Sequence, residues 1–173
     1  MYNATDNPLI VTAYGAGEDG YTKYIAAKMT KIPYGKNANQ DWDGKSNTDK
    51  LAAVTFTDAD GVTKPAYPAA YKAKNTAIGV VAGYTTGLEA GAWWLPSFRE
   101  LFELVRYRKG DSSDQLNKSL AAIGGNKIMP TDFLWSSTEY GSISSWYFNG
   151  ISGLMNGIGY KTLSFGSRAV TSF

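Results

Sequence analysis

The sequence predicts an α+β domain in which helices come first and antiparallel strands follow. Signals for two amphipathic helices lie between Ser97 and Gly125, and aromatic, strand-like runs appear only after Pro130. The two kinds of element therefore do not alternate, as they would in a parallel sheet built from strand–helix–strand units. At 173 residues the chain has the length of one domain, which we expect to span residues 1–173.

The N-terminal part gives the weakest structural signals. Residues 8–14 form a β-branched and aromatic run closed by glycine, which predicts an opening strand. Residues 21–32 fit a strand or a helix equally well. Residues 33–49 are rich in glycine and asparagine, and this composition predicts a long surface loop.

Two short helices are predicted after this loop. Ser46 or Asn47 can cap the first of them, which runs over residues 49–54. The sequence Asp-Ala-Asp-Gly at residues 58–61 predicts a turn. Residues 69–81 are rich in alanine and place larger apolar side chains near helical spacing, so a second helix is predicted there.

The clearest local signal is a capping box at the start of a third helix. Ser97 and Glu100 stand three residues apart, so each side chain can bond the backbone amide of the other and begin a helix at Phe98. Gly110 predicts the end of this helix. Its apolar stripe consists of Phe98, Leu101, Phe102 and Val105.

Another amphipathic helix is predicted directly after it. Ser112 and Gln115 repeat the capping spacing, and Gly124 with Gly125 predicts the end of the helix. Its apolar stripe consists of Leu116, Leu120 and Ile123. Beyond it the pattern changes, and the sequence predicts three strands at residues 133–135, 146–148 and 168–173, separated by Gly- and Ser-rich stretches.

The composition removes several classes of enzyme and metalloprotein. The chain has no cysteine and no histidine. Disulfides, thiolate nucleophiles, imidazole acid–base catalysis and the common zinc and copper sites all need one of these residues. We therefore expect a protein that is not an enzyme, with no catalytic residue, no metal and no cofactor.

The charge pattern gives no sign of a polyanionic partner or of membrane insertion. Seventeen basic and fifteen acidic residues give a net charge of +2, and neither sign forms a long block. We expect no nucleic-acid partner, because such partners require clustered basic side chains. The chain has no apolar stretch long enough to cross a bilayer, and residues 1–10 lack the pattern of a signal peptide.

The acidic residues offer two weak alternatives to a binding function. Residues 41–44 and 58–61 are faintly similar to calcium loops, but both lack the third acid and the distal glutamate of such loops, so turns explain them better. Glu100 and Glu139 could form the carboxylate pair of a small hydrolase. Glu100 already has a capping role, so this reading ranks third.

Three segments resemble a known protein family. They are residues 91–97 (GAWWLPS) with Glu100 and Leu101, residues 134–140 (LWSSTEY), and residues 167–170 (SRAV). They are similar to the C-terminal domain of bacterial collagen-like adhesins and gut-bacterial surface proteins, over roughly residues 44–173. The resemblance implies a C-type-lectin-like fold of the formylglycine-generating-enzyme type, with two helices, antiparallel strands and long irregular loops.

The resemblance does not bring calcium-dependent sugar binding or oxidase activity with it. The Glu-Pro-Asn, Gln-Pro-Asp and Trp-Asn-Asp tripeptides of calcium-dependent lectins are absent, and so are the cysteines on which the oxidase relatives depend. Glu139 lies in a framework motif of the family, which gives it a structural explanation. Binding would therefore be direct, because fold alone confers no activity.

A narrower resemblance concerns residues 141–165. This region is similar to the variable region of proteins diversified by retroelements, of the major-tropism-determinant kind, in which AAC and AAT codons are copied with errors at adenine. The framework positions that the resemblance implies are Trp146, Phe148, Gly153, Met155, Lys161, Arg168 and Val170. The ligand-binding positions that it implies are Ser142, Ile143, Ser144, Tyr147, Asn149, Ile151, Ser152, Leu154, Asn156, Ile158, Tyr160, Thr162, Leu163 and Phe165. Gly141, Gly157, Gly159 and Ser164 are further positions marked as variable.

The residue types in this region fit such a template. Changing both adenines of an AAC or AAT codon cannot produce Met, Trp, Gln, Lys or Glu. Within residues 141–165 these types occur only as Trp146, Met155 and Lys161, which are framework positions.

Strand alternation gives a compatible picture from physics alone. It places Trp146 and Phe148 on one face and Tyr147 and Asn149 on the other, so core aromatics and exposed contact residues are predicted to interleave. The stretch that follows mixes large apolar residues with Gly, Ser and Asn, a composition typical of binding surfaces.

Two main hypotheses follow. In the first, a lectin-like domain on a cell surface, in a secreted protein or on a phage particle presents residues 141–165 to an unknown protein or glycan on a cell surface. In the second, the domain is an invariant structural or adhesive module of a larger cell-surface protein, and the same residues are packed. Exposure of the side chains in the last third would favour the first hypothesis, and burial would favour the second.

Overall fold

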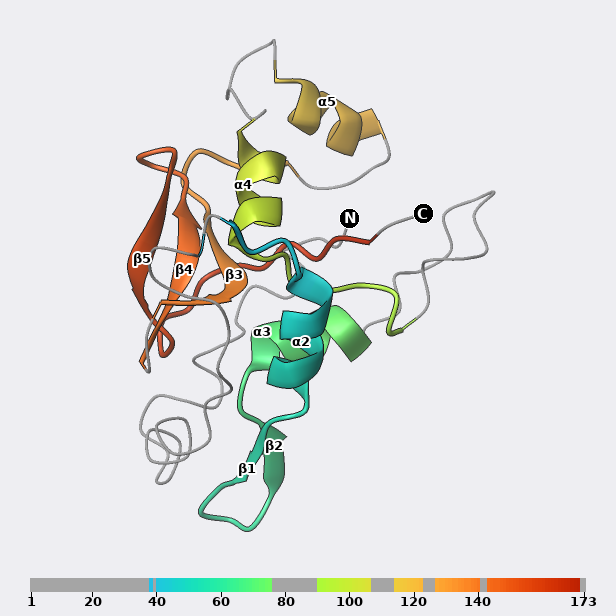
Figure 1. Cartoon of the computed structure of the whole chain (residues 1–173), viewed down its shortest axis with the longest axis vertical. Coiled ribbons are helices and arrows are strands. Elements are labelled where there is room, and N and C mark those ends of the chain that lie inside the picture. The colour runs from blue at the N-terminus through green and yellow to red at the C-terminus, as the bar shows by residue number, and fades with distance from the viewer. Residues whose placement is uncertain are drawn as a thin grey trace.

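The computed structural model describes residues 38, 40–75, 90–106, 114–122, 127–140 and 143–171. Within this part of the chain, four helices and two antiparallel sheets form an α+β arrangement, as predicted (Figure 1). The local sequence signals predicted these four helices, whereas the resemblance implied two. The elements are α2 (Gly44–Ala52), β1 (Thr55–Thr57), β2 (Thr63–Pro65), α3 (Pro68–Asn75), α4 (Phe98–Val105), α5 (Gln115–Ala122), β3 (Phe133–Glu139), β4 (Ser144–Asn149) and β5 (Leu154–Tyr160).

The strands β3, β4 and β5 form one antiparallel sheet with β4 in the middle. Leu134 lies opposite Phe148, and Phe148 lies opposite Met155, so these side chains share one face of the sheet. That face packs on α4 and α5, and Figure 1 shows α4 beside the sheet. The buried cluster between them consists of Leu101, Val105, Leu120, Ile128, Leu134 and Phe148.

The opposite face of the sheet packs on α2 and α3. Trp135 lies opposite Tyr147 on this face. A second buried cluster forms there, and it consists of Leu51, Ala69, Ala70, Ala73, Trp93, Leu95, Trp135, Tyr147 and Ala169. The middle strand β4 therefore contributes to a core on both of its faces, and this arrangement decides which residues of the last third reach the surface.

The predicted capping box at the start of α4 is confirmed. The Ser97 hydroxyl accepts a hydrogen bond from the Glu100 amide, and Oε2 of Glu100 accepts one from the Ser97 amide at 2.8 Å. α4 ends at Val105, with Arg106 as the C-terminal cap. The predicted stop at Gly110 lies outside the described residues.

One buried carboxylate joins three elements around this capping box. Oδ2 of Asp41 accepts hydrogen bonds from Nδ2 of Asn47 in α2 at 2.7 Å and from Oγ1 of Thr138 in β3 at 2.6 Å. The Asp41 backbone oxygen accepts a third bond, from the Ser97 hydroxyl at 2.7 Å. A buried acid with this many donors is satisfied, so its role is structural.

α2 begins earlier than the sequence predicted. Oδ1 of Asp43 accepts from the Ser46 amide at 3.1 Å and caps the helix, so neither Ser46 nor Asn47 is the cap. Gly44 is the first helical residue. It lies so close to the start of α4 that a Cβ atom there would be 2.6 Å from the Ser97 amide nitrogen and would also collide with Glu100. The glycine that suggested a loop is required by close packing between α2 and α4.

The remaining helix predictions are confirmed in part. α3 covers the first part of the helix predicted at residues 69–81, and residues 76–81 lie outside the described residues. α5 is capped by Asp114, whose Oδ1 accepts from the Asn117 amide at 2.9 Å. The predictions that lie outside the described residues are the strand at 8–14, the ambiguous segment at 21–32, Ser112, Ile123, Gly124 and Gly125.

The strand predictions had three errors. β3 and β4 contain the predicted runs and extend beyond them. Of the predicted strand at 168–173, the described residues 168–171 form only an isolated bridge, between Val170 and Trp94. The β1–β2 hairpin and the strand β5 were not predicted, although β5 lies in the middle of the proposed variable region.

Candidate functional site

β5 forms one edge of the three-stranded sheet in the described part of the chain (Figure 1). Exposed side chains occur along the whole length of this strand. Six of the eleven exposed large apolar side chains of the described residues lie on β5 or in the loops beside it. We call the exposed predicted residues of this region the β5 border: Ile143, Ile151, Ser152, Leu154, Asn156, Ile158, Tyr160, Thr162 and Leu163. The strand alone is roughly 20 Å long at 3.3 Å per residue.

The two ends of the β5 border are formed by loops that the sheet holds in place. At one end, the Ile143 backbone oxygen accepts a hydrogen bond from the Lys161 amide at 2.9 Å, so Ile143 lies beside the loop that follows β5. At the other end, Oδ1 of Asn149 accepts from the amides of Ile151 and Ser152 at 3.0 and 3.2 Å. These bonds fix the β4–β5 turn, where the Ile151 side chain is 73% exposed.

The inward positions of β5 need glycine. A Cβ atom at Gly159 would lie 2.6 Å from the Tyr147 ring and 2.7 Å from the Trp135 ring. A Cβ atom at Gly157 would collide with the ring of Tyr140. Both glycines are buried, so these two positions, which the resemblance marks as variable, belong to the packing of the sheet and not to the β5 border.

Tyr147 and Phe165 were expected to be contact residues, and the structure places both in an aromatic cluster. Tyr147 is only 9% exposed, and its ring centroid lies 4.8 Å from that of Phe165 and 6.0 Å from that of Trp135. The predicted alternation along β4 is present, but α2 and α3 cover the face to which Tyr147 points. The expectation that Tyr147 is exposed was therefore wrong, and Phe165 is half-buried.

The remaining predicted contact residues differ in their surroundings. Ser144 is buried in β4, and Asn149 is half-buried at the end of the same strand. Ser142 lies outside the described residues. Of the fourteen predicted positions, nine therefore form the β5 border, four are buried or half-buried, and Ser142 is not described.

The region carries no exposed charged side chain among its described residues. Between Tyr140 and Ser167 the sequence holds one charged residue, Lys161. Lys161 is 6% exposed, and the nearest charged residues on either side, Glu139 and Arg168, are 5% and 1% exposed. The β5 border is thus uncharged and mostly apolar, which keeps the cost of removing it from water low.

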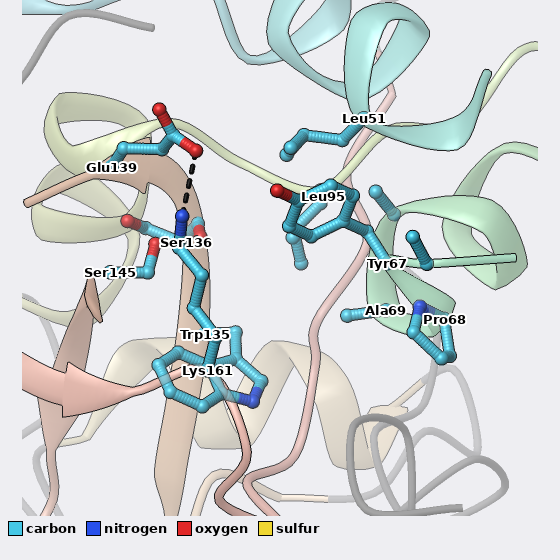
Figure 2. Close-up of a pocket in the computed structure, with 12 residues that line it drawn as sticks. Leu51, Tyr67, Pro68, Ala69, Leu95, Trp135, Ser136, Glu139, Ser145 and Lys161 are labelled. Atoms are coloured by element: carbon cyan, nitrogen blue, oxygen red, sulfur yellow. Dashed lines mark hydrogen bonds and ion pairs between the residues drawn. The ribbon is translucent and has the colours of Figure 1, made fainter. Parts of the chain in front are cut away.

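Lys161 and Glu139 form a buried ion pair at the wall of a small pocket (Figure 2). Nζ of Lys161 lies 2.7 Å from Oε1 of Glu139, and Nζ also lies 5.6 Å from the centre of the Tyr67 ring. Burial lowers the pKa of Lys161, and the Glu139 carboxylate opposes that shift. The cavity is about 40 Å³, too small for the ligands that enzyme clefts usually hold.

The two glutamates considered for hydrolysis both have structural partners. Burial raises the pKa of Glu100, and its hydrogen bonds from the Ser97 amide and from Nε1 of Trp94 oppose this shift. Glu139 is paired with Lys161. No group of three or more His, Cys, Asp or Glu side chains that could hold a metal ion occurs among the described residues.

Two exposed residues beside the β5 border were not predicted as contact residues. Tyr140 directly follows β3 and is 40% exposed, and Met129 lies in a loop whose backbone contacts Gly150. The Gly150 amide donates to the Asp132 oxygen at 2.7 Å, which holds this loop against the β4–β5 turn. Neither residue lies in the segment 141–165, so the narrower resemblance gave no signal that they are contact residues.

The wider comparisons add no relative. The chain matches no family model, no curated protein and no solved structure. The helices of the described residues are all too short and too polar to cross a bilayer. The fold class and the geometry of the β5 border are therefore the observations on which a function can be based.

Proposed function

We propose that the chain is a non-enzymatic ligand- or receptor-binding domain with a C-type-lectin-like fold, which binds a protein or glycan on a cell surface through the β5 border. The observation that carries this proposal is the separation of exposed from buried positions along β5. Large apolar side chains are exposed at Leu154, Ile158 and Tyr160, and Asn156 between them is exposed as well. The alternate residues Met155, Gly157 and Gly159 are half-buried or buried. Soluble domains rarely expose an apolar strand of this kind without a partner for it.

The separation of buried framework positions from exposed positions also supports sequence variation as the source of binding specificity. Six of the seven framework positions are buried or half-buried, and Gly153 in the β4–β5 turn is exposed. Nine of the fourteen implied ligand-binding positions are exposed. Substitution of an exposed residue removes no core contact, so it costs little stability. A retroelement that changes these codons could therefore alter the ligand of the domain while its fold persists.

The setting of the domain follows from this role. A diversified binding face is useful where the ligand is foreign or changing, which fits a cell-surface, secreted or phage-borne protein. The absence of exposed charge from the β5 border favours an apolar protein surface over a charged polymer, because complementary charges would otherwise contribute specificity.

A second candidate function is an invariant structural or adhesive module of a larger cell-surface protein. The burial of Tyr147 and the half-burial of Phe165 favour it, because two of the predicted contact residues serve packing. In that case the β5 border would contact a fixed neighbouring domain and would tolerate little change.

A display library separates the two candidates. The whole chain would be displayed with Ile151, Leu154, Ile158 and Leu163 randomised together, and folding would be followed by protease resistance. We expect most members to remain folded and some to bind lysozyme, serum albumin or streptavidin used as purified probes. A library in which most members unfold, or in which no folded member binds any probe, would contradict the proposal.

A further inference from the structure

Tyr140 lies against the middle of β5, although it belongs to the end of β3. A Cβ atom at Gly157 would collide with the ring carbons of Tyr140. The ring therefore covers the backbone of β5 at Gly157. The Tyr140 amide donates to the Ser144 oxygen at 3.1 Å, which fixes its backbone to β4. The side chain is nevertheless 40% exposed.

A chain of aromatic contacts holds this ring in place. Tyr140 makes an edge-to-face contact with Trp146, with ring centroids 5.3 Å apart and planes at 80°. Trp146 makes the same kind of contact with Phe98 of α4, at 4.8 Å and 83°. The position of the Tyr140 ring is thus set by α4 through Trp146, and it does not depend on the exposed residues of β5.

We propose that Tyr140 is a fixed contact residue of the β5 border, which supplies the same aromatic anchor to each ligand while the neighbouring exposed residues determine which ligand binds. This inference rests on the proposed function. A tyrosine held by its neighbours loses little side-chain entropy on binding, and such rigid aromatic side chains dominate the affinity of many interfaces. Gly157 acts as a positioning residue, because only glycine leaves room for the ring.

The test uses binders selected from the display library described above, each directed against lysozyme, serum albumin or streptavidin. Each binder receives Tyr140→Ala, or Tyr71→Ala as the matched control. Tyr71 lies on α3 and is 41% exposed, so the two substitutions remove equally exposed rings. We expect Tyr140→Ala to raise the Kd about tenfold for binders of all three probes, and Tyr71→Ala to change it less than twofold.

Two further variants separate binding from folding. Tyr140→Leu keeps an apolar side chain against Trp146 but lacks the ring, and we expect it to weaken binding while the midpoint of thermal unfolding stays near that of the parent. Gly157→Ala displaces the ring and leaves it in the chain, and we expect a similar loss of affinity. If the Tyr140 ring made no contact with the probe, both variants would bind the probe with the same Kd as the parent binder.

The outcomes distinguish this inference from the function on which it rests. Binders that keep their affinity after Tyr140→Ala and Tyr140→Leu would overturn the role of Tyr140 and leave the proposed function standing. An equal loss from Tyr71→Ala would overturn it as well, because the effect would not be local. A folded library without any binder would overturn both.

Discussion

Nζ of Lys161 lies 2.7 Å from Oε1 of Glu139, and only 7% of each side chain is exposed. This ion pair joins the end of β3 to the residue that follows β5. It therefore fastens the loop that carries Thr162 and Leu163 to the sheet, and it fixes one end of the β5 border. Breaking a buried ion pair leaves one charge without its partner, which is among the costliest changes in a protein interior.

Replacement of this lysine tests the role of the ion pair. Lys161→Met is expected to lower the free energy of unfolding by about 3–5 kcal/mol, because the Glu139 carboxylate loses its counter-charge in the interior. Lys74→Met is the control, since Lys74 pairs with Asp49 on the surface and such pairs contribute about 1 kcal/mol or less. Urea denaturation measures both. Equal effects of the two substitutions would mean that the ion pair is screened by solvent.

The division between core and β5 border predicts two very different responses to substitution. Tyr147→Ala should destabilise the domain by about 3 kcal/mol or more, because it leaves a cavity beside Trp135 and Phe165. Leu154→Ser and Ile158→Ser should each change the free energy of unfolding by about 0.5 kcal/mol or less. Chemical denaturation measures the free energy of unfolding of the three variants. A large decrease for Leu154→Ser would show that β5 is covered in the folded protein.

The inward glycines of β5 should tolerate substitution less well than the exposed positions beside them. Gly159→Ala should cost about 1–3 kcal/mol, because the added methyl group would meet the buried rings of Tyr147 and Trp135. Thr162→Ala, at an exposed position just beyond the strand, should be nearly neutral. Thermal unfolding of both variants is the measurement. A neutral Gly159→Ala would contradict the close packing of the aromatic cluster on β5.

Glu100 predicts a pH dependence of known sign. Because burial raises its pKa in the folded state, the folded protein binds more protons than the unfolded chain at pH values above about 4.5, the usual pKa of glutamate. The contribution of Glu100 to stability is therefore complete below that pH and falls as the pH rises through the raised pKa. Glutamine can also close a capping box, so Glu100→Gln should gain stability relative to the parent between pH 4 and 7.

Urea denaturation of the parent and of Glu100→Gln across this range isolates the effect of one group, because the other titrations cancel in the difference. A difference that is constant with pH would mean that folding leaves the pKa of Glu100 unchanged, and a change in the opposite direction would mean that folding lowers this pKa. Either result would contradict the burial of the carboxylate.

The local signals of the sequence were sufficient for α4 and insufficient for α2. The capping box of Ser97 and Glu100 needs only residues three apart, so it could be identified without the fold. The start of α2 depends on the contact of Gly44 with the Ser97 and Glu100 region, about fifty residues away in the chain. The hydrogen bond between Asp41 and Thr138 likewise joins distant segments, and no local pattern reveals it.

The candidate site could be predicted in outline, and its exact membership could not. β5 escaped prediction because two of its inward positions are Gly157 and Gly159, and the side chains that fill the space above them come from Tyr140, Tyr147 and Trp135. Alternation correctly assigned Tyr147 to the face opposite Phe148. It could not tell that both faces of the middle strand are covered, because that depends on how helices from earlier in the chain pack on the sheet.

Deep sequencing of the gene and its flanking DNA from a single cultured lineage tests the central claim most directly. We expect substitutions at adenine-derived bases within codons 141–165, at the β5 border positions among others, beside a near-copy repeat and a reverse transcriptase gene. We expect unchanged codons for Trp146, Phe148, Met155 and Lys161. A locus that stays constant and has no repeat would contradict diversification and leave an α+β domain with a fixed surface.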